Sequence, residues 1–205
     1  IGDVVKGLRH ANHKDIVVVD DGSKDRTAEI AGEAGAQVIR HVINRGQGAA
    51  LRTGIEFALR HDADVIVTFD ADGQMRVEDI PMMVAPVAKG EADVTLGSRF
   101  LTMGSNVPPL RRFWLQMGAF LFRIIYGVRL TDSHNGFRAL SRHAAEAIEI
   151  KAARMEHASE IIDEIGKHGL RYLEIPVVVR YTDYSKAHSS QGLFPAIRIF
   201  VRTIA

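Results

Sequence analysis

Short apolar runs alternate with helical patterns along the first hundred residues of this 205-residue chain. The apolar run at residues 16–19 follows a helical pattern that starts at Ile1. The same order then repeats, with helices expected near residues 27–31, 49–59 and 77–89 and strands near 37–39, 64–69 and 93–96. Strands that alternate with helices of this length favour an α/β fold, with a mostly parallel sheet and helices on both faces.

The second half of the chain is less regular. We expect an apolar-aromatic helix over residues 111–126, a strand at 137–140, helices near 142–150 and 158–168, and a last strand at 172–181. No internal repeat, low-complexity stretch or Pro/Gly-rich linker divides the sequence. Because 46% of the residues are apolar, the chain can bury one substantial core, and we expect residues 1–205 to form a single domain.

Composition narrows the classes of function. Lys and Arg number 26 against 25 Asp and Glu, so no global attraction to nucleic acid is expected. Cysteine is absent, which excludes disulfides, thiolate nucleophiles and cysteine-ligated zinc. No run approaches the about 18 apolar residues that cross a bilayer, and no signal-peptide pattern follows Ile1. We expect a cytoplasmic protein.

Charged residues follow three of the expected strands. Asp20 and Asp21 follow the strand at 16–19, Asp70 and Asp72 follow the strand at 64–69, and Arg99 follows the strand at 93–96. Ligands of open α/β sheets collect at the carboxyl ends of the strands. We therefore expect these side chains to share one site.

Asp70 and Asp72 are separated by one small residue, Ala71. Two such carboxylates can both reach a hard divalent cation, and Gln74 can add a neutral oxygen. The cation would neutralise a diphosphate. The alternative is an ordinary turn after a strand, since Asp and Gly favour turns, and the segment after Asp20 has the same alternative, a turn followed by a helix cap.

The glycine-rich segment that starts at Asn44 matches neither common phosphate-binding loop. A dinucleotide fingerprint that uses Gly46 and Gly48 would need a third glycine at Leu51, and a P-loop would need Gly-Lys followed by Ser or Thr.

Taken together, four segments resemble the inverting family-2 glycosyltransferases of GT-A fold. They are Val-Val-Asp-Asp-Gly-Ser-x-Asp-x-Thr from Val18, Asn-x-Gly-x-Gly-Ala-Ala from Asn44, Asp-Ala-Asp-Gly-Gln from Asp70, and Gly-Ser-Arg ending at Arg99. Their order and spacing agree over most of the chain. The Asp-Ala-Asp-x-Gln form is most similar to dolichol-phosphate mannose synthase and related polyprenyl-phosphate sugar synthases.

The resemblance implies a site for a nucleotide-sugar donor. Asp21, with Asp20 beside it, would contact the base or ribose. Gly46 and Gly48 would lie near the nucleotide, and Ala71 would face the donor.

The resemblance also implies that Asp70, Asp72 and Gln74 bind Mg²⁺ or Mn²⁺, with Asp70 also beside the donor. Arg99 would bind a donor or acceptor phosphate, because a planar guanidinium suits phosphate oxygens. The alternative for Arg99 is a solvated arginine at a strand end.

On the acceptor side, the resemblance implies Asp132 as a residue that orients the acceptor or shapes the site. Glu156 matches the position of a catalytic base in many relatives, and it equally fits a first-turn acid that the helix dipole favours. Arg180 and Lys186 would bind phosphates from a late loop, with a solvated loop as the alternative. His134 is the one histidine near these residues.

The implied reaction moves a sugar from a nucleoside diphosphate, GDP-mannose or a UDP-sugar, to a polyprenyl phosphate, with inversion. Two alternatives remain open: a saccharide hydroxyl as acceptor, or a non-catalytic binding domain of GT-A fold.

The sequence departs from the family pattern at its ends. Relatives open with a strand that ends in Pro-x-Tyr-Asn-Glu, and nothing similar precedes Ile1. We therefore expect this first strand to be missing from the sequence by truncation or disorder. Residues 193–205 could lie on the cytoplasmic face of a membrane as an amphipathic segment, or form a terminal helix that packs on the core.

Overall fold

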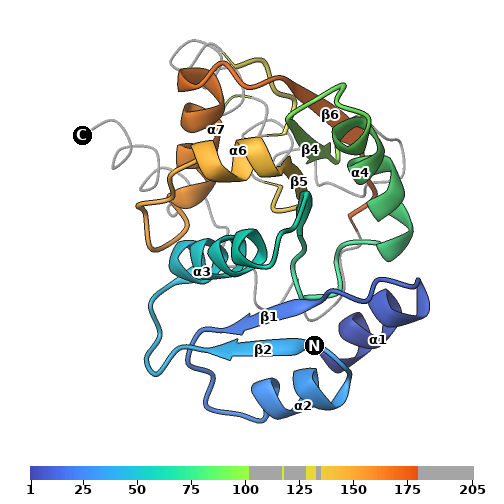
Figure 1. Ribbon diagram of the computed structural model, residues 1–205, viewed down its shortest axis with the longest axis vertical. Helices are drawn as coiled ribbons and strands as arrows, with labels where there is room; N and C mark the ends of the chain where they lie inside the picture. Colours follow the sequence, from blue (N-terminus) through green and yellow to red (C-terminus); the bar gives the residue numbers. More distant parts are fainter. Residues whose placement is uncertain (102–116, 118–127, 133–134, 180–205) are drawn as a thin grey trace.

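The computed structural model describes residues 1–101, 117, 128–132 and 135–179. The chain begins with a small unit built on two strands: α1 (Gly2–His10), β1 (Val17–Asp20), α2 (Thr27–Glu33) and β2 (Gln37–Arg40). The two strands pair in parallel. Figure 1 shows α1 and α2 on one side of this pair and α3 (Gln47–Arg60) on the other. The predicted helices and strands of this region are confirmed.

A second sheet has the strand order β3-β5-β4-β6. Its members are β3 (Val65–Thr68), β4 (Val94–Ser98), β5 (Arg138–Ser141) and β6 (Tyr172–Pro176). β4 and β6 are parallel, whereas β5 is antiparallel to both β3 and β4. The α/β class is confirmed.

One strand, β5, runs antiparallel to both of its neighbours and makes this second sheet mixed. Arg138 at the start of β5 lies opposite Leu96 near the end of β4. The chain therefore enters β5 at the edge where β4 finishes. An antiparallel strand can start there directly, whereas a parallel one would need a crossover back to the opposite edge.

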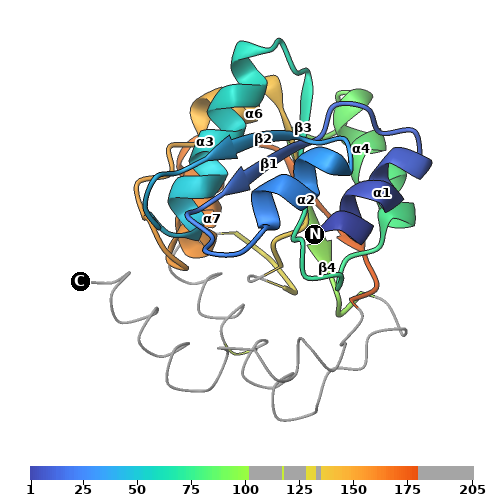
Figure 2. The same cartoon turned by 90° about the horizontal axis from the view of Figure 1, so that it is seen from below.

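Helices cover both faces of the second sheet. The short helix η1 (Val77–Asp79) leads into α4 (Ile80–Ala88) on one face. α6 (Arg142–Ala147) and α7 (His157–Lys167) follow later in the chain. Figure 2 shows α3, α6 and α7 on one side of the molecule and α1 and α4 on the other.

The core is divided by the second sheet into two clusters. Leu140 of β5 belongs to the larger cluster, with apolar residues of α3, α6 and α7. Its neighbours Phe137 and Ala139 belong to the smaller cluster, with Met83 of α4. This alternation follows from the two-residue period of a strand, which points successive side chains to opposite faces.

Two predicted elements are shorter than expected. The helix near 142–150 ends at Ala147, and the strand at 172–181 ends at Pro176, because its partner β4 ends at Ser98. The helix expected over 111–126 (apart from residue 117), the polar loop after residue 181 and the segment 193–205 lie outside the described residues.

Within the described residues, β1 pairs only with β2, and β3 pairs only with β5. In this part of the chain β1 and β3 therefore each have one edge without a partner strand. None of the helices in the described ranges has the length and apolar character needed to cross a membrane.

Candidate functional site

Three charged residues lie at the carboxyl ends of β3 and β4. Asp70 lies two residues after β3, and Arg99 directly follows β4. Arg138 is the first residue of β5, opposite Thr68 of β3 and Leu96 of β4. Since β5 is antiparallel to both neighbours, its first residue lies at the edge where they end. The sheet therefore places Asp70, Arg99 and Arg138 at one edge.

Arg99 and Asp132 are joined in a buried ion pair. Arg99 Nε lies 2.6 Å from Asp132 Oδ2, and Nη2 lies 3.1 Å from Oδ1. The Arg99 backbone N–H also donates to Oδ2, at 3.2 Å. Both side chains are almost fully buried. The guanidinium that we expected to bind phosphate is thus oriented by Asp132, which acts on the site through Arg99.

Glu174 of β6 fastens the segment that carries Asp132. Its Oε1 accepts hydrogen bonds from the Thr131 backbone N–H at 2.8 Å, the Thr131 hydroxyl at 2.9 Å and the Asp132 N–H at 3.2 Å. The Thr131 hydroxyl also contacts that of Ser98, at 2.6 Å. Asp132 is consequently held in place from two neighbouring strands, β4 and β6.

Arg138 is a buried cation that the sequence interpretation did not select. Its side chain is 2% exposed, and burial lowers its pKa to about 10 although Asp70 and Asp132 act in the opposite direction. The available signal was its place inside an otherwise apolar strand. An arginine is rarely buried unless it has opposite charges around it.

The carboxylate of Asp70 lies against the backbone of Gly136. A Cβ at Gly136 would stand 2.6 Å from Asp70 Oδ2, so only glycine leaves room for this carboxylate. Burial raises the pKa of Asp70, the charge of Asp72 raises it further, and Arg138 lowers it. Asp72 itself is exposed, and its Oδ1 accepts the backbone N–H of Gln74 at 2.9 Å.

This arrangement fits a divalent cation. A nearby cation stabilises the ionised form of a carboxylate whose pKa is raised by a neighbouring carboxylate. Among the described residues, no group of three or more His, Asp or Glu side chains is suited to hold a metal. Asp70 and Asp72 with the neutral oxygen of Gln74 form an oxygen set of the kind that binds Mg²⁺ with substrate phosphates completing the shell.

Asp20 serves the turn after β1. Its Oδ1 accepts the backbone N–H of Ser23 at 2.9 Å, and its Oδ2 lies 3.2 Å from Arg40 Nε. The carboxylate is 2% exposed. The contacts of Asp20 therefore agree with its alternative interpretation, a residue of an ordinary turn.

Asp21 holds the segment that follows β2. Its Oδ1 accepts from the Arg45 N–H at 2.8 Å, its Oδ2 accepts from the Gly46 N–H at 2.6 Å, and Oδ1 lies 2.7 Å from His41 Nδ1. Partial burial raises the pKa of Asp21, but these hydrogen bonds outweigh it and the net pKa is lowered. Sequence reasoning missed His41, although it directly follows a strand, as Arg99 does.

The glycines of the segment after Asn44 allow a close backbone contact. The carbonyl oxygen of Ala153 accepts from the N–H groups of Gly48, at 2.8 Å, and Ala49, at 3.2 Å. A Cβ at Gly48 would clash with the carbonyl of Ala152, and one at Gly46 would clash with that of Ala153. The first turn of α3 is thereby capped by the segment before α7.

Glu156 is the N-cap residue of α7, but its side chain makes no capping hydrogen bond. The next residue, His157, is buried, and its Nδ1 lies 2.7 Å from the Arg154 carbonyl oxygen. Burial is the main cause that lowers the pKa of His157, and the charge of Arg138 lowers it as well. The start of α7 therefore lies within electrostatic reach of Arg138.

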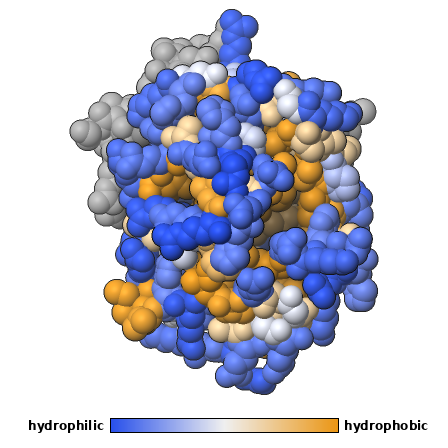
Figure 3. Space-filling model, viewed as in Figure 1, coloured by the Kyte–Doolittle hydropathy of each residue, from blue (hydrophilic) through white to orange (hydrophobic). Residues whose placement is uncertain are grey.

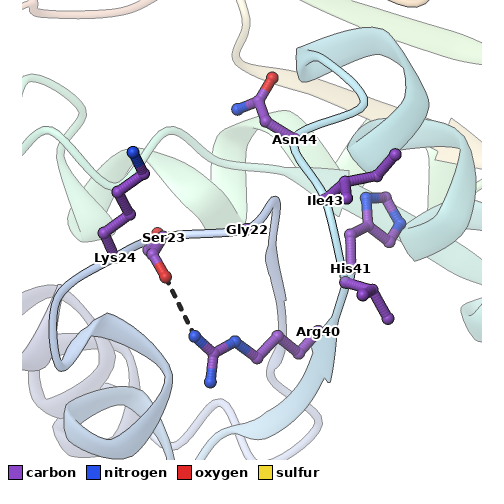
Figure 4. Close-up of a pocket in the computed structure, with 8 residues that line it drawn as sticks. Gly22, Ser23, Lys24, Arg40, His41, Ile43 and Asn44 are labelled. Carbon is purple, nitrogen blue, oxygen red and sulfur yellow. Dashed lines mark hydrogen bonds between the residues drawn. The ribbon is translucent and has the colours of Figure 1, made fainter.

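A surface pocket of about 770 Å³ lies beside the Asp21 segment. Figure 4 shows Ser23 and Lys24 on one side of it, facing Arg40 and Ile43 on the other. Val42 and Ile43 are 99% and 69% exposed. In Figure 3, orange side chains project at the lower left, where Figure 1 places the turn after β2. Asp70 and Arg99 do not line this pocket.

Three predicted positions lie outside the described residues, namely His134, Arg180 and Lys186. Asn135, which follows His134, is described. Its Oδ1 accepts the Phe137 N–H at 3.1 Å, and its buried Nδ2 has no hydrogen-bond partner among the described residues.

Comparison with known proteins identifies the family to which the chain is similar. The sequence model described as "Glycosyl transferase family 2" matches residues 1–149. An uncharacterized protein of Methanocaldococcus jannaschii is 41% identical, over 93% of this chain and 80% of its own length. The UDP-N-acetylglucosamine–dolichyl-phosphate N-acetylglucosaminyltransferase of Methanococcus voltae is 31% identical, over 100% of this chain and 89% of its own length.

A solved structure confirms the fold. Glucosyl-3-phosphoglycerate synthase from Mycobacterium tuberculosis, in complex with Mn²⁺ and UDP-glucose, superposes with a TM-score of 0.73 at 19% identity. The match covers 100% of this chain and 71% of that one. That enzyme has the GT-A fold expected from the sequence. On the strength of the family match and these relatives, the chain belongs to glycosyl transferase family 2 and is a glycosyltransferase.

Proposed function

We propose that this glycosyltransferase moves a sugar from a nucleoside-diphosphate donor, GDP-mannose or a UDP-sugar, to a polyprenyl phosphate, in a reaction that depends on Mg²⁺ or Mn²⁺. The observation that carries the proposal is the edge formed by β3, β4 and β5. There the carboxylate of Asp70 lies within electrostatic reach of Asp72 and of the buried cation Arg138.

On the donor side, Asp21 has one acceptor position left for a nucleotide. Each carboxylate oxygen can accept about two hydrogen bonds. Oδ1 already faces Arg45 N–H and His41 Nδ1, whereas among the described residues Oδ2 faces only the Gly46 N–H. We infer that Oδ2 accepts from the base or ribose. Gly46 and Gly48 then contribute by placing the backbone of this segment, not by contacting phosphate.

The diphosphate would lie at the edge that holds Asp70, Asp72 and Gln74. When bound there, Mg²⁺ or Mn²⁺ supplies positive charge that stabilises the leaving diphosphate. The chain itself contributes two fixed positive charges. Arg138 and Arg99 are held in place before the reaction, so little reorganisation is needed when negative charge develops on the leaving group.

The choice of acceptor rests on the M. voltae relative, whose name specifies a dolichyl phosphate. A phosphate oxygen is ionised near neutral pH and can attack without a strong general base. Arg99 engages both carboxylate oxygens of Asp132, so we assign Asp132 to orienting Arg99. Glu156 is then the one carboxylate among our predicted catalytic residues that a hydroxyl acceptor would use.

Because a polyprenyl phosphate resides in a bilayer, we propose that the protein works at the cytoplasmic face of a membrane. Arg180, Lys186 and residues 193–205 would contribute phosphate contacts and the approach to the lipid.

The central experiment measures sugar transfer from GDP-mannose, UDP-glucose and UDP-N-acetylglucosamine, each with Mn²⁺, to a short polyprenyl phosphate and to a free saccharide. We expect transfer to the polyprenyl phosphate, loss of transfer with EDTA, and loss of Mn²⁺-dependent nucleotide binding in Asp72→Ala. Unchanged nucleotide affinity in that variant would contradict the metal site.

Glu156→Gln separates the two acceptor classes. For a phosphate acceptor the variant should keep nearly all activity, and for a hydroxyl acceptor it should lose a factor on the order of 10²–10⁴. An equal loss with both acceptors would contradict this assignment of Glu156.

A further inference from the structure

His41 links α3 to the carboxylate of Asp21. The side chain of His41 is 8% exposed, and Figure 4 shows its ring beside α3 rather than reaching across the surface pocket. Its Nδ1 lies 2.7 Å from Asp21 Oδ1, and its Nε2 lies 3.0 Å from the Thr53 hydroxyl. The Thr53 hydroxyl also lies 3.0 Å from the Ala49 carbonyl oxygen in the same helix. Both ring nitrogens are therefore engaged.

The direction of the hydrogen bond to Asp21 follows from chemistry. An ionised carboxylate only accepts hydrogen bonds, so the hydrogen on Nδ1 of His41 points at Asp21. This hydrogen bond joins those from the N–H groups of Arg45 and Gly46. The carboxylate of Asp21 is thus held on one side by a ring fixed to α3 and on the other by the backbone of the segment after β2.

We propose that His41 is a positioning residue of the nucleotide site. It orients Asp21 so that Oδ2 presents its remaining acceptor position to the nucleotide, and Thr53 fixes the ring for this purpose. The inference rests on the proposed function, in which Asp21 contacts the base or ribose, and it deepens that function. His41 touches neither donor nor metal, and it acts through Asp21 alone.

The test uses two substitutions of His41, each of which keeps a nitrogen near the position of one of the two ring nitrogens. In His41→Asn the amide nitrogen can stand near the position of Nδ1, and in His41→Gln it can stand near Nε2. The probes are UDP and GDP, each with Mn²⁺, titrated calorimetrically into the full protein. His61→Asn and His61→Gln, at the exposed end of α3, are the matched controls.

We expect His41→Asn, which keeps the contact with Asp21 and loses the one with Thr53, to bind the preferred nucleotide within a factor of a few of the wild type. His41→Gln should bind it about ten-fold more weakly, the size of one charge-assisted hydrogen bond. Turnover at saturating donor should change little in both, so that the effect appears in KM rather than kcat. In the Asp21→Asn background, His41→Gln should cause no further loss, because the two residues act on the same contact.

A merely structural role gives a different pattern. The two His41 variants would then lower the melting temperature by similar amounts and leave nucleotide affinity unchanged, which would overturn the proposal. Equal weakening by His41→Asn and His41→Gln, or a full additional loss in the Asp21→Asn background, would overturn it as well. Absence of UDP and GDP binding by the wild type would instead overturn the proposed function, and this role with it.

If His41→Gln does not fold, Thr53 supplies the comparison. Thr53→Ser keeps the hydroxyl that fixes the ring and should bind nucleotide like the wild type. Thr53→Val removes it and should weaken binding by a factor of a few. Equal affinity of the two Thr53 variants would contradict the proposal.

Discussion

Arg99 and Asp132, 33 residues apart in the chain, form a bidentate ion pair with Nε 2.6 Å from Oδ2 and Nη2 3.1 Å from Oδ1. The pair lies beside the buried cation Arg138, whose charge is balanced by Asp132 and Asp70. Asp132 is therefore the carboxylate partner of a buried arginine, and its loss removes that partner.

Asp132→Asn should destabilise the fold strongly. Removing one partner of a buried ion pair costs about 3–5 kcal/mol, because the other charge stays buried without compensation. The measurement is urea denaturation, compared with Asp62→Asn. Asp62 also pairs with an arginine, Arg142, but its side chain is 97% exposed. The loss of stability in Asp62→Asn should be barely measurable. Equal losses of stability in the two variants would show that burial does not determine the cost of breaking the ion pair.

Gly48→Ala and Gly54→Ala should differ in sign although both lie inside α3. A Cβ at Gly48 clashes with the Ala152 carbonyl, whereas one at Gly54 makes an ordinary contact with Val19. We expect Gly48→Ala to destabilise the protein by about 1–3 kcal/mol. Gly54→Ala should stabilise it by about 0.5–1 kcal/mol through better helix propensity. Thermal or urea denaturation checks this pair, and similar behaviour of the two variants would refute the close contact at Gly48.

Asp70→Asn should raise stability and remove metal binding. Burial and the charge of Asp72 raise the pKa of Asp70, so its ionised form is disfavoured by the fold at neutral pH. We expect Asp70→Asn to unfold at a higher urea concentration than the wild type in EDTA, while Mn²⁺-dependent nucleotide binding is lost. Asp72→Asn, at an exposed position, should lose the same binding with a smaller gain in stability, because burial, the larger cause, still acts on Asp70. A less stable Asp70→Asn would mean that its charge is needed to compensate Arg138.

Asp21 should contribute a pH-dependent part of the stability. Its pKa in the folded state is lower than the usual value of 3.8. The contribution is therefore fully present above the unfolded-state pKa and is lost as the pH falls through the folded-state pKa. The free energy of unfolding, measured by urea denaturation across acid pH, should fall less steeply below about pH 4 in Asp21→Asn than in the wild type. The control Asp15→Asn, at an exposed position, should follow the wild-type curve.

Most of the fold could be predicted from the sequence, because local periodicity reports secondary structure. The runs that became β1, β3 and β4 are apolar and flanked by helical patterns, so their class and their order were visible. The direction of β5 could not be predicted in this way. Strand direction depends on which edge the chain has reached, and no pattern within residues 138–141 carries that information.

The candidate site, like the fold, could be predicted from the sequence only in part. The sequence by itself determined which charged residues lie at the strand ends, because an apolar run marks where its own strand finishes. These residues are Asp20, Asp21, Asp70, Asp72 and Arg99. Only the tertiary structure decided their partners. Arg99 meets Asp132, Asp21 meets His41, and Gly48 meets Ala152 through sheet order and register, which bring together groups that lie 20 to about 100 residues apart.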